Sequence, residues 1–255
     1  MCYVISINYF ELFNRGPANV NKYINNSAFT EDLSLFEIGP TFFGKNPGEQ
    51  QIVVGGLKSG KINRKSWLDK ERDVDIFDIK GDVMRTLVEL GIEEKNLFVS
   101  DNTKYSYHPG RSGSVTLKSE KGPHLAYFGE IHPAIIKNLD FKDKNIFGFE
   151  IFLKNIPEPN KKLRQSKKSF QASDYQKSER DFAFVVDKIF KIGALEKIIR
   201  EVDENLIQSV STFDVYEGEN IPKDKKSVAI NVTLQAIDKT LSENDLDDIS
   251  KKIIV

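Results

Sequence analysis

The apolar residues of this chain follow two different periods, and their order along the sequence constrains the fold more than any other feature. Alternation with a period of two, typical of strands with one buried face, occurs at Leu33–Ile38 and Ser227–Ala236. Helical spacing occurs at Ile79–Leu90, Lys191–Glu204 and Ser242–Ile254. The mixture predicts an α+β protein rich in antiparallel strands.

These patterns divide into two groups. In the first group, strands are predicted at 33–38, 51–57, 96–99, 113–118, 124–130 and 145–152, and helices at 79–90 and 134–138. From residue 180 onward the predicted order is strand, helix, strand, strand, helix. One more strand would complete a ferredoxin-like split β-α-β sandwich, so we expect a second domain of that kind without its last strand.

A short basic segment separates the two groups. Residues 157–172 begin with two nearby prolines, and no acid occurs between residues 160 and 172. The positive residues there are Lys161, Lys162, Arg164, Lys167 and Lys168. We predict an interdomain linker that either contacts a negatively charged partner or stays solvated.

The composition excludes several classes of protein. The chain has 255 residues, with 37 Lys and Arg against 38 Asp and Glu, so it is not a histone-like polycation. Its one cysteine, Cys2, can form neither an internal disulfide nor a cysteine-based zinc site, and it indicates a reducing, cytoplasmic location. The sequence contains no apolar run long enough to predict a transmembrane helix.

Two patterns resemble catalytic motifs but have simpler explanations, which are a glycine turn for the first and chance proximity among 38 acids for the second. Residues Gly55–Lys61 match G-x-x-x-x-G-K, but Ile62 stands where a phosphate loop needs Ser or Thr. A strand that ends in a glycine turn is the favoured interpretation. The neighbouring acids Asp73, Asp75 and Asp78 carry no signal of the raised pKa that a catalytic dyad needs.

The histidines are also predicted to be structural. His108 and His132 each precede a proline, and no two histidines have the spacing of a helical metal site. Turn-forming residues with hydrogen-bonded imidazoles are the favoured interpretation, and a general base at His108 is the alternative. Phe213 and Tyr216 flank Asp214 in a predicted strand, where they either pack in the core or stack on an unpaired base.

Seven motifs occur in an order that points to one family. They are Phe36–Pro40, Asp75–Gly81, Tyr107–Gly113, Gly129–Pro133, Ser173–Asp187, Phe213–Gly218 and Lys226–Gln235. Together they resemble the C-terminal half of the bacterial phenylalanyl-tRNA synthetase β subunit. The resemblance implies that residues 33–156 form its catalytic-like module, a class II synthetase-like antiparallel sheet without the chemistry. It also implies that residues 173–255 form the ferredoxin-fold anticodon-binding domain.

The resemblance implies a function as well. The chain is expected to support aminoacylation of tRNA(Phe) without catalysing it, as a partner of the catalytic α subunit in an (αβ)2 heterotetramer. No cofactor is expected on this chain, because no glycine-rich strand precedes Glu179–Arg180 to complete a phosphate clamp, so ATP and Mg²⁺ are assigned to the α subunit. A stand-alone RNA-binding or regulatory protein that reuses the anticodon module, or a non-functional fragment, are the alternatives.

The resemblance places the segment Phe213–Gly218 near the anticodon. Tyr216 is predicted to stack on an anticodon base, and the basic linker residues to attract phosphates. The predicted tRNA-binding set is Tyr216, Phe213, Arg180, Lys161, Lys162, Arg164, Lys167 and Lys168, with no catalytic or metal-binding residue. Because residues 173–255 carry 12 basic and 17 acidic side chains, local patches and stacking are expected to provide the affinity.

Both ends of the sequence depart from the family. Residues 1–32 match the family's arginine- and leucine-rich helical start poorly, and the editing parts of a full β subunit are missing. The last strand of the anticodon-binding domain is also missing. We therefore expect a subunit that is truncated at both ends.

Overall fold

The computed structural model describes residues 32–42, 46, 48–62, 67–68, 70–138, 145–158 and 173–254. The chain divides into two compact units, Met1–Gln165 and Ser166–Val255, each of which is described by itself. The N-terminal segment up to residue 31 and the five basic residues of the predicted linker lie outside the described residues. No described helix combines the length and the apolar character that a membrane crossing requires.

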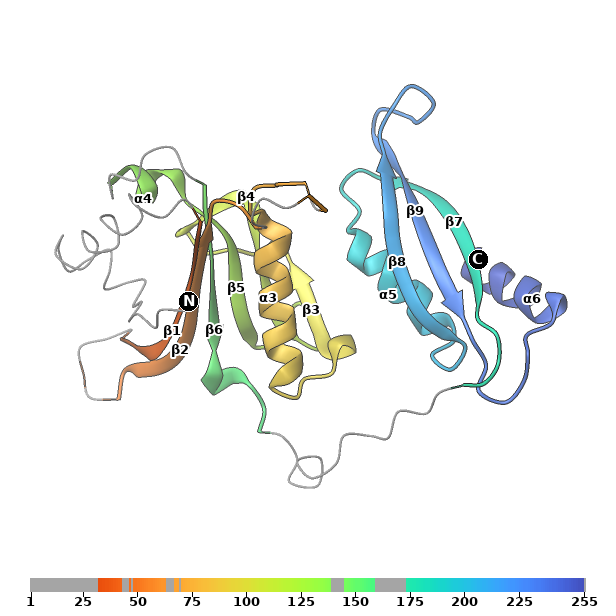
Figure 1. Cartoon of the computed structure of the whole chain (residues 1–255), viewed down its shortest axis with the longest axis horizontal. Helices are drawn as coiled ribbons and strands as arrows, with labels where there is room; N and C mark the ends of the chain where they lie inside the picture. Colours follow the sequence, from red (N-terminus) through yellow and green to blue (C-terminus); the bar gives the residue numbers. More distant parts are fainter. Residues whose placement is uncertain are drawn as a thin grey trace. The chain divides into compact units, whose positions relative to one another are not determined.

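The first unit is built on a six-stranded antiparallel sheet with the strand order β1-β2-β6-β5-β4-β3 (Figure 1). The strands are β1 (Leu33–Phe42), β2 (Gln50–Ser59), β3 (Leu97–Ser100), β4 (Tyr107–Leu117), β5 (His124–Ile131) and β6 (Ile146–Phe152). The strand predicted to stop before Gly39 continues to Phe42. Because β1 lies at the edge of the sheet, it tolerates Pro40.

Helices complete this unit. The longest is α3 (Ile76–Glu89), and the short ones are α4 (Pro133–Asn138) and the 3-10 turns η1 (Glu94–Asn96) and η2 (Leu153–Asn155). Ile79, Val83 and Leu87 of α3 recur every four residues, are fully buried and pack on one face of the sheet. This packing forms the main core of the unit.

The acids before and within α3, whose proximity was expected to be chance, have a structural role. Asp75 accepts hydrogen bonds from the backbone N–H groups of Phe77 and Asp78, while the Asp78 carboxylate accepts one from the N–H of Asp75 (2.9 Å), which completes a capping box. Arg72 donates two hydrogen bonds to Asp78, at 2.7 and 2.6 Å, and so lowers the pKa of that carboxyl. These carboxylates fix the start of the helix.

Two of the family motifs meet where β4 pairs with β5. Arg111 forms an ion pair with the buried Glu130 (2.5 Å), and Ser112 lies opposite Gly129. Gly129 has φ 151°, and a Cβ there would lie 2.3 Å from the Ser112 Cβ. Only glycine fits at this position, because a side chain would meet both steric and backbone strain.

The hydrogen-bonded imidazoles predicted for His108 and His132 and the glycine turn predicted for the phosphate-loop pattern are confirmed, but His108 lies in a strand and not in a turn. The Nδ1 atoms of His108 and His132 accept backbone hydrogen bonds from Gly110 and Ala134, both at 3.1 Å. His108 lies within β4, where the pairing register shifts. The G-x-x-x-x-G-K pattern forms the end of β2 and a left-handed turn at Gly60 (φ 87°).

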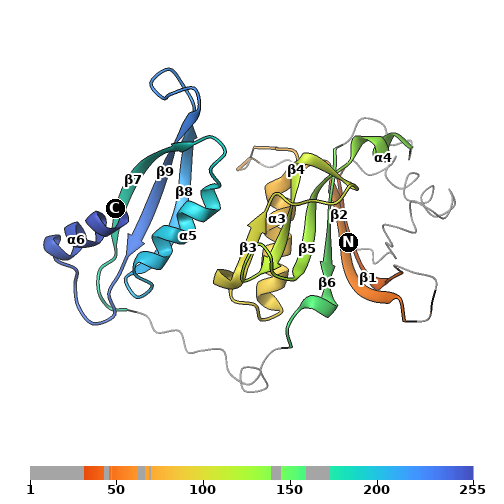
Figure 2. The same ribbon diagram turned by 180° about the vertical axis from the view of Figure 1, so that it is seen from behind.

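The second unit is a three-stranded antiparallel sheet in the order β7-β9-β8, with two helices on one face, seen from both sides in Figures 1 and 2. Its elements are β7 (Ser178–Asp187), α5 (Ile192–Val202), β8 (Ile207–Tyr216), β9 (Lys225–Leu234) and α6 (Glu243–Ile254). This order is the predicted one. The helices bury the apolar side chains of β9. The opposite face of the sheet carries the alternate side chains of each strand, and we call it the open face.

Candidate nucleic-acid interface

Tyr216 lies on the open face because β8 contains a bulge. Thr212 pairs with the buried Ile230, but Asp214 pairs with the next residue of β9, Ala229, so one residue of β8 has no counterpart on β9. In a regular strand Tyr216 would share the face of Thr212, whose hydroxyl bonds to Glu196 of α5 (2.7 Å). The bulge instead brings Tyr216 opposite Ser227, on the face away from the helices.

The ring of Tyr216 is supported by a glycine. A Cβ added to Gly218 would lie 2.0 Å from the Tyr216 Oη and 2.2 Å from its Cζ, so the ring covers the bare backbone there. Tyr216 remains 48% exposed. A half-exposed ring held from below is suited to stacking against a flat partner such as a nucleobase.

The neighbours of Tyr216 on the open face are small or short. Ser227 lies between Tyr216 and Val185, and Ala229 lies between Asp214 and Ala183 in the next row. Because these side chains are short, they leave the face of the Tyr216 ring uncovered. The open face is not basic, because Asp214 and the pair Asp181–Asn231 (2.8 Å) also lie on it.

The other predicted tRNA contacts do not gather around Tyr216. Phe213 is 59% exposed and is the extra residue of the bulge. Arg180 is exposed and pairs with Val232, so it belongs to the helix-covered face rather than the open face. The five basic residues of the predicted linker lie outside the described residues, and their contribution stays a prediction.

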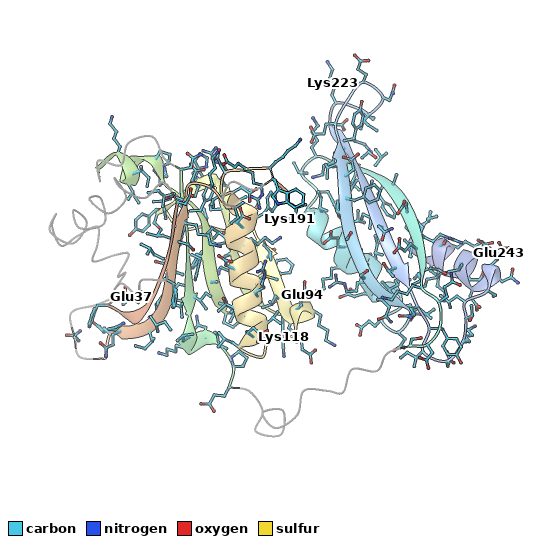
Figure 3. The ribbon with its side chains drawn as sticks, viewed as in Figure 1. Glu37, Glu94, Lys118, Lys191, Lys223 and Glu243 are labelled. Carbon is cyan, nitrogen blue, oxygen red and sulfur yellow. The ribbon has the colours of Figure 1, made fainter. Side chains whose placement is uncertain are left out.

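Sequence reasoning missed a group of lysines near Tyr216. They lie on the turn between β7 and α5 and on the β8–β9 loop with the start of β9, two segments joined by the hydrogen bond from the Lys188 N–H to the Asp224 carbonyl. Lys191 and Lys223, one from each segment, are labelled in Figure 3. They are Lys188, Lys191, Lys223, Lys225 and Lys226. We call this group the lysine end. The signal was present in the run Lys223-Asp-Lys-Lys, but the other members are distant in sequence.

Backbone and ionic contacts hold the lysine end together. Lys188 forms an ion pair with Glu217 (2.8 Å), and its backbone N–H donates to the carbonyl of Asp224 (2.9 Å). The ammonium of Lys226 donates to the carbonyl of Lys188 (2.9 Å). These contacts fix the loop beside Tyr216. The same segments also carry Asp187, Glu217, Glu219 and Asp224, so the five lysines exceed the acids there by one.

The first unit exposes an apolar stripe on its edge hairpin. Phe36, Ile38 and Phe42 of β1 project from one face, and Ile52 of β2 lies on the same face opposite Pro40. Their exposed fractions range from 41% for Phe36 to 58% for Ile38. A contiguous exposed set of large apolar side chains is typical of a protein–protein contact. We call it the edge stripe.

The described residues offer no catalytic metal centre. Within them, no group of three or more His, Cys, Asp or Glu side chains is placed to hold a metal ion. Glu179 and Arg180 lie side by side on β7, exposed, and Arg180 donates to the Glu179 carbonyl (3.3 Å). That pair is part of the second unit and is separate from the six-stranded sheet.

Comparison with known proteins covers nearly all of the described chain. The phenylalanyl tRNA synthetase beta chain CLM domain matches residues 20–153, and the ferredoxin-fold anticodon binding domain matches residues 173–255. The chain belongs to the phenylalanyl-tRNA synthetase beta chain family. The recognition made from the seven motifs is thereby confirmed, together with the α+β fold and its ferredoxin-like second unit.

Individual beta chains support this membership. The phenylalanine–tRNA ligase beta subunit of Paramagnetospirillum magneticum is 41% identical over 224 residues, which is 88% of this chain and 28% of that subunit. Those of Rhodospirillum rubrum and Mesorhizobium japonicum are 40% and 36% identical, with 27% and 28% of their lengths covered. The chain thus spans little more than a quarter of the beta subunits it matches.

One solved structure shows only a slight likeness. A pyrrolysyl-tRNA synthetase of Desulfitobacterium hafniense aligns with 54% of this chain at 12% identity and a TM-score of 0.39.

The motif Phe213–Gly218, one of the seven that carry the family resemblance, contains both Tyr216 and Gly218, the glycine beneath its ring. The position of Tyr216 on the open face is therefore the best-defined part of the candidate interface.

Proposed function

We propose that this chain is a non-catalytic, tRNA-binding part of phenylalanyl-tRNA synthetase, which supports the aminoacylation of tRNA(Phe). The observation that carries the proposal is the match of two beta chain domains in their order, with a half-exposed tyrosine on the open face of the second. We assign residues 33–156 to the non-catalytic module, 157–172 to a linker and 173–255 to anticodon binding. The cytoplasm is the proposed location.

In this proposal the anticodon loop docks on the open face. Tyr216 stacks on one unpaired base, a contact worth roughly 1–3 kcal/mol. The lysine end binds phosphates beside the loop, and Lys161, Lys162, Arg164, Lys167 and Lys168 of the linker bind others. Phe213 belongs to the same proposed set as a contact at its margin, and Arg180 belongs to it as a contact with tRNA away from the open face.

The partner in this proposal is the catalytic alpha subunit, in an (αβ)2 heterotetramer. The edge stripe supports it, because large apolar side chains at 41–58% exposure on a sheet edge favour burial by a second protein. ATP, Mg²⁺ and phenylalanine bind the alpha subunit in this arrangement. The isolated chain then forms no aminoacyl adenylate.

Co-purification with the alpha subunit tests this function. The wild-type chain should retain the tagged alpha subunit on a column, and Ile38→Asp, which places a charge in the edge stripe, should lose it. Val185→Asp, an equally exposed apolar residue of the second unit (52%), is the matched control and should retain binding. If the wild-type chain binds tRNA but ignores the alpha subunit, a stand-alone RNA-binding protein is the better description.

A further inference from the structure

A row of polar residues and glycine crosses the first sheet on the face opposite to α3. The strand pairs place six residues side by side, one from each strand. They are Glu37, Gly55, Glu150, Tyr127, Ser114 and Ser100, and we call them the polar row. Glu37, Ser114 and Ser100 are at most 7% exposed. Apolar side chains normally occupy the buried face of a sheet, so this row requires an explanation.

The middle of the polar row is a site for an ammonium group. The Nζ of Lys104, from the β3–β4 connection, lies 2.7 Å from a carboxylate oxygen of Glu150. It also lies 4.7 Å from the ring centre of Tyr127 and 4.6 Å from that of Phe152. A carboxylate combined with two aromatic faces is an environment that stabilises a cation. Lys104 therefore shows which chemical group this face of the sheet accepts.

A second carboxylate in the polar row, that of Glu37, has an oxygen without a hydrogen-bond partner among the described residues. Glu37 is 7% exposed, and among the residues that the structure describes, no donor or cation contacts its buried Oε2. A Cβ added to Gly39 would lie 3.5 Å from the Glu37 Oε1, and Gly55 lies directly across the strand pair. Burial raises the pKa of Glu37. An unpartnered buried carboxyl is costly unless a proton or a cation compensates it.

We propose that the polar row binds a small molecule with a primary ammonium group, which Glu37 holds. Lys104 is held by Glu150, so Glu37 is the carboxylate of the polar row that no cation neutralises among the described residues. The two carboxylates are separated by the strand that carries Gly55, about 10 Å between Cα atoms, so a ligand ammonium at Glu37 does not displace Lys104. Because Glu37 is buried, the ligand enters by a local opening and binds slowly.

Titration of the full chain with n-butylamine tests the proposal, because this probe reproduces the side chain of lysine. Calorimetry should show saturable binding of n-butylamine and none of n-butanol, which has the same length without the charge. Glu37→Gln should weaken the binding about tenfold or more, since it removes the charge at nearly constant shape. Glu89→Gln, on the exposed side of α3, is the matched control and should bind as the wild type does.

Three results would overturn the proposal: no saturable binding to the wild-type chain, equal affinity for n-butanol, or undiminished affinity of Glu37→Gln. Thermal unfolding first establishes that Glu37→Gln is folded. If it is not, Glu37→Met, which suits an apolar site of the same size, replaces it in the titration with the same expected loss. None of these measurements involves tRNA or the alpha subunit, so the outcome is independent of the proposed function.

Discussion

Gly218 and Tyr216 form a coupled pair whose energetics follow from the structure. The three atoms nearest to a Cβ at Gly218 all belong to the Tyr216 ring, at 2.0, 2.2 and 2.8 Å. Gly218→Ala must therefore move the ring off the backbone. A tyrosine buries about 150–250 Å² when it is fully covered, and Tyr216 is 48% exposed, so about 100 Å² of packing is at stake.

At about 25 cal/mol per Å², that area corresponds to at most about 2.5 kcal/mol. We expect Tyr216→Ala and Gly218→Ala each to destabilise the second unit by about 1–2 kcal/mol, because both forfeit the same contact. In the double variant the alanine at position 218 meets no ring, so its cost should disappear. The coupling energy should then be about 1–2 kcal/mol, as measured by urea unfolding of the four chains.

The affinity for tRNA(Phe) distinguishes base stacking by Tyr216 from a role in which Tyr216 only holds the β8–β9 loop in place. Tyr216→Ala should weaken binding about 5- to 150-fold, the range that corresponds to the loss of one stacked base, and should leave the salt dependence unchanged. Tyr216→Phe keeps the ring and should retain the affinity. Additive stabilities would refute the ring-on-glycine packing. An unchanged affinity per folded molecule in Tyr216→Ala would remove this residue from the interface.

Four further predictions follow from other parts of the chain. Gly129→Ala should lower the melting temperature of the first unit strongly, whereas Gly193→Ala, whose Cβ meets nothing, should not. The double variant Lys223→Ala/Lys226→Ala should reduce the slope of log affinity against log salt by about 1–2 in tRNA titrations. Burial raises the pKa of Glu37, so its contribution to stability is full below the unfolded-state pKa and is lost as the pH rises through the folded-state pKa. The stability of Glu37→Gln relative to the wild type should therefore increase as the pH rises above about 4, as measured by urea unfolding. Phenylalanine-dependent pyrophosphate exchange should be absent from the isolated chain, and its presence would contradict the non-catalytic role.

Much of the fold could be predicted because the local signals agree with the tertiary structure. The helix predicted at 79–90 is found as α3, since the spacing of its apolar residues matches the face that packs on the sheet. Its start was placed late because the capping box at Asp75 and Asp78 precedes the first buried residue. The predicted strand at 113–118 begins earlier, at Tyr107, because Tyr107 pairs with Ile131 of β5 before an irregular stretch that ends where Ser112 pairs with Gly129.

The candidate interface could be predicted only in part. The aromatic residue Tyr216 was visible in the sequence, but its face depends on a bulge at Phe213 that strict alternation cannot reveal. Arg180 belongs to the predicted tRNA-binding set, but the register places it on the helix-covered face. The polar row was invisible, because its six members come from six strands and meet only through the pairing register of the whole sheet.

Discrimination between an intact and an abasic anticodon loop tests the central claim most directly. The affinity of the full chain for the anticodon stem–loop of tRNA(Phe) should be measured at one fixed salt concentration, beside the same stem–loop with its three anticodon bases removed to leave abasic sites. The account predicts a clear preference for the intact loop, because base stacking at Tyr216 and not phosphate attraction dominates in an acidic domain. Equal affinity for the two stem–loops would contradict the claim that Tyr216 binds the anticodon loop by stacking on a base.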